Sequence, residues 1–204
     1  AARWEMDESG TGPDGRPCGD LYVGVDVGRD HDLTVMWVIE RISGQLYTRK
    51  LIELQDMPFS QQEAILYALL NLPMVRRCCM DATGLGRQLA ERARERFGYT
   101  VEEVQFTAPV KEGLAYPLRS AFEDRGVRIP KDDRIRADLR SIKKTTTLAG
   151  NIRFEADRGK NGHADRFWAL ALAIHASAQA AGMPHVISGG RRVAAGMVRR
   201  IRER

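Results

Sequence analysis

The stretch Leu21-Tyr-Val-Gly-Val-Asp-Val-Gly28 predicts a buried strand that carries one charged side chain. Its residues are apolar and alternate as those of a buried strand do, yet Asp26 stands near its end. An ionised carboxylate inside an apolar strand is costly unless a cation or a hydrogen-bond network compensates its charge. Gly24 and Gly28 flank Asp26, and we expect them to leave backbone room for a ligand or a metal ion.

Two further acids stand in comparable settings. Asp81 ends the run Cys78-Cys-Met-Asp81, and Asp165 opens a long apolar helix over 167–174. Three acids at the ends of regular elements indicate a metal site. Taken singly, each is more often a turn former or a helix cap than a ligand, and these roles stay open for Asp81 and Asp165. The segment Thr83-Gly-Leu-Gly86 either presents backbone N–H groups to a phosphate or simply makes a turn.

The composition is that of an ordinary globular protein with a mildly basic balance. The 204 residues suffice for one domain with a full core, and 43% hydrophobic content is typical of such domains. A net charge of +5 permits a nucleic-acid partner without requiring one. The three cysteines show neither a disulfide framework nor zinc-ligand spacing, which favours a reducing, intracellular setting. The longest apolar run, within 167–181, is too short to span a bilayer, so we expect no membrane partner.

The first quarter of the chain indicates a lead-in followed by an antiparallel meander. Residues 1–19 are rich in glycine and proline, which is typical of a linker, and since the chain does not begin with methionine we expect it to be part of a longer protein. Strands are predicted at 20–28, 33–41 and 45–54, joined by short turns. The acidic turn Asp30-His-Asp32 lies between the first two.

The middle of the chain changes period and predicts a β-α-β arrangement with parallel strands. Ser60-Gln-Gln-Glu63 matches a capping box that opens a helix to about Asn71. A strand over 75–80 leads into Asp81. An amphipathic helix over 86–97 follows, and a further strand is predicted over 99–106.

The last part is predicted to be mainly helical. Helices are expected from Pro109 to about 124, over 132–144 and over 164–181, with a short extended piece at 127–130. A hairpin is expected over 145–155, with its turn at Gly150-Asn151. The arginine-rich residues 183–204 are expected to form a basic tail.

This order of elements resembles the ribonuclease H-like fold, an α/β fold in which a mixed central sheet is flanked by helices. Four segments make the resemblance specific: "VGVDVGRDHDLTVM", "CMDATGLGRQLAERA", "GVRIPKDDRIRADLRSIKK" and "HADRFWALALAIHA". Together, and in this order, they are similar to the nuclease domain of tailed-phage large terminase subunits, those of Mu-like phages and prophages in particular. We therefore expect residues 20–182 to form one nuclease domain.

The resemblance implies an endodeoxyribonuclease that cuts concatemeric double-stranded viral DNA during packaging. Phosphodiester hydrolysis needs an activated water and a stabilised leaving oxygen, and two divalent ions about 3.5–4 Å apart supply both. Mg²⁺ or Mn²⁺ is the expected cofactor because a few carboxylates suffice to bind it. By resemblance, Asp26 bridges the two ions, while Asp81 and Asp165 each complete one ligand shell. A carboxylate at a helix N-terminus, as for Asp165, is also electrostatically favoured.

Weaker candidates surround these three acids. Four cations are candidates for phosphate contacts with DNA, although an exposed charged face is the default reading of each: Lys111, Lys143, Lys144 and Arg153. Three further side chains are candidates for contacts behind the metal ligands, with a solvated turn or cap as the plainer reading: Asp30, Asp32 and His163.

The family resemblance also implies partners that lie outside this chain. Large terminases carry an ATPase domain in the same polypeptide, and no G-x-x-x-x-G-K-[ST] loop for it occurs here. The portal, the small terminase subunit and double-stranded DNA are the other expected partners, at the procapsid in the host cytoplasm. Two alternatives stay open. One is a non-catalytic module of nuclease-like fold that docks DNA or the portal; the other is an actin-like or sugar-kinase-type phosphotransferase, for which 204 residues leave little room.

Overall fold

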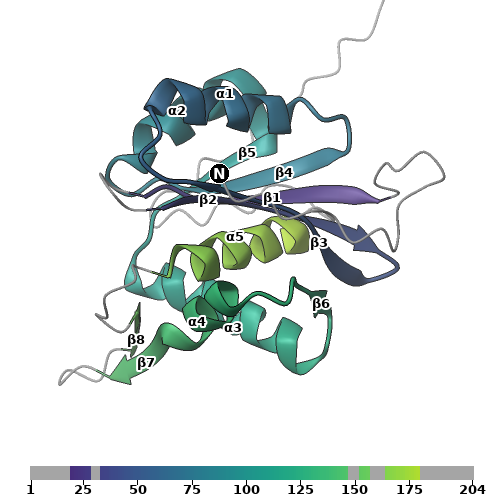
Figure 1. The fold of residues 1–204 in the computed structure, drawn as a ribbon, viewed down its shortest axis with the longest axis vertical. Coiled ribbons are helices and arrows are strands. Elements are labelled where there is room, and N and C mark those ends of the chain that lie inside the picture. The colour runs from purple at the N-terminus through teal and green to yellow at the C-terminus, as the bar shows by residue number, and fades with distance from the viewer. Residues whose placement is uncertain (1–18, 29–32, 147–151, 157–163, 180–204) are drawn as a thin grey trace, which may run out of the picture.

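Three antiparallel strands begin the fold of the computed structural model, which describes residues 19–28, 33–146, 152–156 and 164–179. They are β1 (Asp20–Asp26), β2 (Thr34–Ile42) and β3 (Gln45–Leu54). β2 pairs antiparallel with both of the others, so the predicted meander is confirmed. β1 and β2 are buried on both faces because helices cover the sheet on each side (Figure 1).

Parallel strands extend this meander into a six-stranded sheet in the order β5-β4-β1-β2-β3-β6. β4 (Val75–Asp81) pairs parallel with β1, and β5 (Val101–Val104) pairs parallel with β4, as the β-α-β pattern predicted. The piece predicted only as extended is β6 (Val127–Arg128), which joins the far edge parallel to β3. The expected mixed sheet is thereby confirmed.

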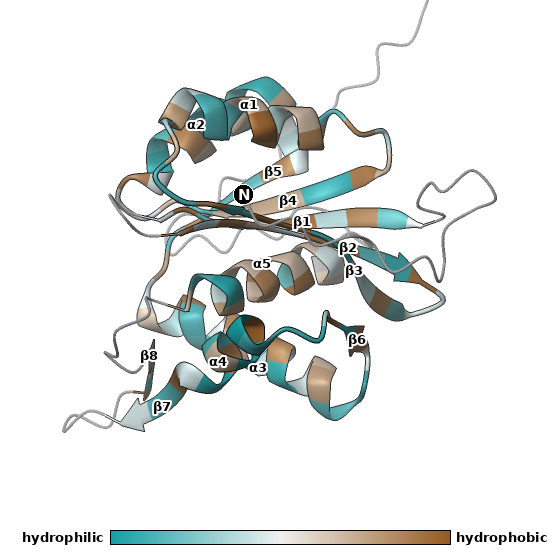
Figure 2. Ribbon diagram, in the orientation of Figure 1, coloured by the Kyte–Doolittle hydropathy of each residue, from teal (hydrophilic) through white to brown (hydrophobic). Residues whose placement is uncertain are grey.

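Helices divide between the two faces of the sheet (Figure 1). One face is covered by α1 (Phe59–Leu70) and α2 (Gly86–Phe97), and the other by α3 (Ala108–Glu123), α4 (Asp133–Ser141) and α5 (Asp165–Gln179). Each face has its own hydrophobic core, with Trp37 buried on the α5 side and Leu66 on the α1 side. Figure 2 shows apolar residues along α5 and a mixture of apolar and polar residues on the outer helices, as expected for helices with one face on a core.

Gly24 has a different role from the one predicted. A Cβ atom added there would lie 2.0 Å from the carbonyl oxygen of Ala169 and 2.3 Å from the backbone nitrogen of Ala173, both in α5. Its missing side chain therefore lets helix α5 touch the backbone of β1, and the space belongs to a helix rather than to a ligand. This close approach determines how α5 crosses the sheet.

The predicted capping box at Ser60 is wrong. Helix α1 begins at Phe59 after Pro58, and no side chain caps it. The carbonyl oxygen of Pro58 accepts hydrogen bonds from the backbone of Gln61 and Gln62 instead. Glu63 turns away along the helix and accepts from the Tyr67 hydroxyl at 2.8 Å. The spacing of a capping box is present in the sequence, but the N-cap position falls at Pro58, two residues before Ser60.

Boundaries in the second half also differ from the predictions. The helix predicted over 132–144 ends at Ser141, and β7 (Ile142–Thr146) follows, paired antiparallel with β8 (Ile152–Ala156). The hairpin is therefore longer than predicted, and its turn at Gly150-Asn151 lies outside the described residues. The strand predicted from Tyr99 begins at Val101, after a 3₁₀ turn η1 (Gly98–Thr100). The expected lead-in and basic tail lie almost entirely outside the described residues.

Candidate metal centre

Asp26 and Asp81 end two neighbouring parallel strands. Val25 is paired with Met80, so the two aspartates are the next residues in register at the same edge of the sheet. Val25 and Met80 point into the core on the α1 side, and side chains alternate along a strand, so both aspartates face α5. They are 7% and 8% exposed, respectively. A bound cation is one arrangement that balances the charge of buried carboxylates on neighbouring strands.

Asp165 opens helix α5 at this same edge. The helix runs along the sheet so that Ala169 covers Gly24, while the carbonyl oxygen of Ser177 lies against the Arg41 guanidinium near the opposite end of β1. The first turn of α5 therefore lies toward Asp26. The Asp165 side chain is partly exposed, and its place in the first helical turn favours its anionic form.

The three acids converge on one edge without forming a single tight cluster. Among the described residues, one group of three potential ligands has its ligand atoms within 4.8 Å of one another. That group does not include Asp26, Asp81 or Asp165. Two metal ions about 3.5–4 Å apart need no such compactness, because each binds only some of the acids. The all-carboxylate donor set suits Mg²⁺ or Mn²⁺, so the residues present fit the implied ions.

Asp81 also has the local role that was left open for it. One of its carboxylate oxygens, Oδ1, accepts a 2.8 Å hydrogen bond from the backbone N–H of Thr83. The Thr83 hydroxyl in turn accepts from the backbone of Phe106 at 2.9 Å. Gly86 then begins α2 so close to Asp81 that a Cβ would lie 2.5 Å from the Asp81 carbonyl oxygen. This strand-to-helix turn therefore holds the Asp81 carboxylate in one orientation.

A fourth acid on this face, Glu53, was missed by the sequence analysis. Asp26 pairs with Val35, and Val35 pairs with Glu53, so the three residues form one row across β1, β2 and β3. Glu53 is 6% exposed, and its Oε1 accepts a 2.6 Å hydrogen bond from Arg166 Nε. The sequence did carry a signal for Glu53. It stands two residues after Leu51 in the predicted strand, so both side chains point to the same buried side, where a charged group needs a partner.

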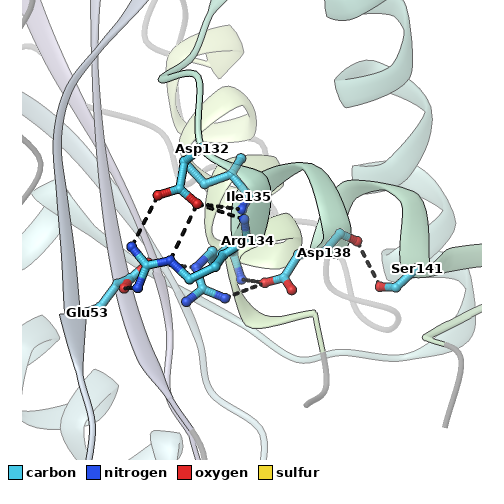
Figure 3. Close-up of polar contacts among 7 residues, drawn as sticks. Glu53, Asp132, Arg134, Ile135, Asp138 and Ser141 are labelled. Atoms are coloured by element: carbon cyan, nitrogen blue, oxygen red, sulfur yellow. Dashed lines mark hydrogen bonds and ion pairs between the residues drawn. The ribbon is translucent and has the colours of Figure 1, made fainter. Parts of the chain in front are cut away.

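The partners of Glu53 form a network at the start of α4 and α5 (Figure 3). Arg166 Nη1 also donates to Asp138 at 3.0 Å, and Arg134 lies 3.5 Å from Glu53 Oε2. Burial works against the charged form of Arg166, but its hydrogen bonds to Glu53 and Asp138 hold its pKa above the ordinary value. The charge of Glu53 is thus matched by arginine side chains.

The four cations predicted to contact DNA occupy two places. Lys111, in the first turn of α3, places its Nζ 4.9 Å from the centre of the Trp168 ring, near the start of α5. Lys144 on β7 donates to the Tyr116 hydroxyl at 2.9 Å. Lys143 and Arg153 are exposed on the β7–β8 hairpin, beside Lys144. Asp30, Asp32 and His163, which were predicted to support the metal ligands, lie outside the described residues.

The two cysteines of β4 face opposite sides of the sheet, as expected from alternation along a strand. Cys78 belongs to the core under α1 and Cys79 to the core under α5, and both thiols are free and fully buried. Burial raises the pKa of both thiols. In the part of the chain that the structure describes, no helix combines the length and the apolar character that crossing a membrane would take.

Comparisons with known proteins agree with this architecture. The chain is 32% identical over 162 residues to the Mu-like prophage FluMu protein gp28 of Haemophilus influenzae, a match over 76% of this chain and 31% of that protein. It is 30% identical over 169 residues to the probable terminase large subunit gp28 of Escherichia phage Mu, over 79% of this chain and 30% of that protein. The chain thus spans about a third of the length of the curated relatives it matches.

A solved structure and a family description extend the agreement to the fold. The structure is similar to the large terminase nuclease from thermophilic phage G20c with bound magnesium, at 28% identity and a TM-score of 0.67. That match covers 78% of this chain and 82% of the other. The family described as the terminase RNaseH-like domain matches residues 23–177, which include all three acids. The chain therefore belongs to the family of terminase RNaseH-like domains.

Proposed function

We propose that this domain is a metal-dependent endonuclease that cuts concatemeric double-stranded DNA during genome packaging. The observation that carries the proposal is the pair of buried carboxylates, Asp26 and Asp81, at adjacent parallel strand ends facing α5. Asp165 begins that helix at the same edge. The nuclease of phage G20c, with which this chain shares the fold, has bound magnesium, which supports a divalent-ion site.

Each acid has a distinct task in this proposal. Asp26 lies on the strand next to Asp81 and under α5, so it is the acid best placed to be shared between two ions, with Asp81 and Asp165 as the outer ligands. Two Mg²⁺ or Mn²⁺ ions bound there would supply an activated water and would stabilise the leaving oxygen of a phosphodiester. The Thr83 N–H keeps Asp81 oriented, and the helix N-terminus favours the anionic form of Asp165.

The remaining residues serve the substrate and the assembly. Lys111 near the start of α5, and Lys143, Lys144 and Arg153 on the hairpin, contact phosphates without reading sequence. Asp30, Asp32 and His163 support the ligands from the neighbouring segments. Double-stranded DNA, an ATPase domain of the same polypeptide, the portal and the small terminase subunit are the partners, at the procapsid in the host cytoplasm. Family membership argues against the phosphotransferase alternative.

The direct test is cleavage of supercoiled plasmid by the purified domain in Mg²⁺ or Mn²⁺. We expect cutting that EDTA abolishes and that Asp26→Asn reduces at least a hundredfold, because the substitution keeps the size of the side chain but removes its charge. Asp81→Asn and Asp165→Asn should also be severe. Asp20→Asn is the matched control, since Asp20 lies exposed at the opposite end of the same strand and pairs with Arg76.

Two outcomes would count against the proposal. If the folded wild-type domain leaves plasmid intact across millimolar Mn²⁺, independent nuclease activity is refuted. If the wild-type domain binds DNA without cutting it, and binding is equally strong after all three acids are replaced, the domain is a docking module instead.

A further inference from the structure

A second group of potential metal ligands lies on the α5 side of the sheet, beginning with Cys79, two residues before Asp81 on β4. Cys79 of β4, Glu102 of β5 and His175 of α5 bring a sulfur, an oxygen and a nitrogen atom together within 4.8 Å of one another. In the described part of the chain, no other group of three such side chains is this compact. The three residues come from three different elements, so the tertiary fold alone creates the group.

The Glu102 carboxylate lies between the other two ligands, with one oxygen toward the Cys79 sulfur and the other toward His175. Cys79 Sγ lies 3.4 Å from Glu102 Oε2, and His175 Nε2 lies 3.7 Å from Glu102 Oε1. With zinc bond lengths of about 2.0–2.3 Å, tetrahedral geometry separates neighbouring ligand atoms by about 3.4–3.6 Å. An ion therefore fits between the three side chains with small adjustments of their rotamers.

The donor set selects a particular class of ion. Thiolate, imidazole and carboxylate together suit Zn²⁺ or Co²⁺, whereas Mg²⁺ prefers oxygen ligands alone. Arg77 donates from Nε to Glu102 Oε2 at 3.1 Å, which leaves Oε1 directed to His175. A ligating carboxylate commonly has such a hydrogen-bond partner behind it.

Two of the three ligands face a solvent-filled pocket, and the sulfur of Cys79 is buried behind them. Glu102 and His175 line a pocket of about 700 Å³ between α2, β5 and α3, together with Val104, Thr107 and Leu114. The pocket has room for a water molecule as the fourth ligand. It also gives an entry path for the ion and an exit path for the proton that the Cys79 thiol loses on forming a metal–sulfur bond.

We propose that Cys79, Glu102 and His175 form a binding site for one zinc-type ion, which fastens α5 to β4 and β5. The site is distinct from the carboxylate edge, and its existence does not depend on nuclease activity. Its structural effect is to hold the helix that begins with Asp165 against the strand that ends with Asp81.

Cobalt spectroscopy tests the proposal on a variant in which the carboxylate edge is disabled. In the double variant Asp26→Asn, Asp81→Asn, stripped of metal, one equivalent of Co²⁺ should produce a thiolate-to-cobalt charge-transfer band and tetrahedral visible bands. Adding Cys79→Ser should remove the charge-transfer band. Adding Cys78→Ser is the matched control and should leave it unchanged, because the adjacent thiol faces the other core. Zn²⁺ at a hundredfold excess over its Kd should raise the Tm by about 5 °C.

A second variant keeps the test decisive when the first variant does not fold. If Cys79→Ser does not fold, His175→Gln, checked by circular dichroism, should weaken Co²⁺ binding at least tenfold. Absence of the charge-transfer band in the double variant, or its survival in Cys79→Ser, refutes the site and leaves the group as an ion-pair cluster. Failure of this proposal is distinguishable from failure of the nuclease proposal, since DNA cleavage is read separately and depends on Asp26.

Discussion

Arg166 Nε donates a 2.6 Å hydrogen bond to Glu53 Oε1, and this contact joins the first turn of α5 to the end of β3. Glu53 stands in the same row of the sheet as Asp26, separated from it by Val35. Asp165 immediately precedes Arg166, so the ion pair determines how the start of the helix sits above the row of acids. Arg166 is therefore a positioning residue, which acts on the proposed site through the helix.

Replacing Arg166 should destabilise the domain and weaken cleavage together. Arg166→Gln leaves the buried Glu53 with the more exposed Arg134, and we expect a loss of about 3 kcal/mol in the free energy of unfolding, measured with urea. Arg166→Lys keeps the charge but not the two-pronged geometry, so it should recover part of the activity. Arg119→Gln, which breaks an exposed pair, should leave the unfolding midpoint almost unchanged. An unfolding midpoint unchanged in Arg166→Gln would contradict the positioning role.

Gly24→Ala should be among the most damaging single-methyl additions in the chain. The new Cβ would lie 2.0 Å from the Ala169 carbonyl, so α5 must shift, and we expect at least about 2 kcal/mol of destabilisation and a large loss of cleavage. Gly113→Ala is the control, because no atom lies within 4 Å of its added Cβ and the residue is in helix α3. That change should stabilise the domain by about 0.5–1 kcal/mol. Equal unfolding midpoints for the two variants would refute the packing argument.

Asp132 should give α4 a pH-dependent stability. Its carboxylate accepts from the backbone of Arg134 and Ile135 as the N-cap, and the Arg134 side chain, with those backbone groups, lowers its pKa. Because the folded pKa is lowered, the stabilisation is complete above the unfolded value of about 3.9 and is lost as pH falls through the folded value. Asp132→Ala should cost about 1 kcal/mol at pH 7, and this difference from wild type should shrink below about pH 4.

Asp133→Ala is the control for the cap, since the Asp133 side chain is 92% exposed and only pairs with Arg136 along the helix. Urea unfolding at pH 7 should show a change of about 0.5 kcal/mol or less for this variant. A cost for Asp133→Ala as large as that for Asp132→Ala would indicate a general charge effect in place of capping.

The hairpin lysines should contribute to DNA affinity by neutralising phosphates. In an Asp26→Asn background, replacing Lys143 and Lys144 with alanine should reduce the slope of log affinity against log salt by about 0.9 for each phosphate that is no longer neutralised. Fluorescence anisotropy with duplexes of different sequence should show the same weakening for all of them. Arg76→Ala is the control, because Arg76 is an exposed cation near the start of β4, at the end of that strand away from Asp81. It should leave the slope unchanged. If both variants behave alike, the hairpin has no special role.

The order of strands and the positions of the three acids were accessible from sequence, because both depend on local pattern. Alternation and apolar runs report that a strand is buried, and the aspartates stood where those patterns stop. Local pattern was misleading where the spacing of apolar residues fits a helix although the chain forms a strand. Ile142 continues the helical spacing of Ile135 and Leu139, yet it begins β7, because pairing with β8 outweighs the weak helical preference of a short segment.

Only the tertiary structure decided which distant elements meet. Glu53 and Arg166 are 113 residues apart, and nothing local to either one specifies the other. The same holds for Cys79, Glu102 and His175, and for Gly24, whose small size serves a helix far along the chain. The physical reason is that periodicity records which face of an element avoids water, whereas the identity of the element covering that face depends on how the whole chain closes around its core.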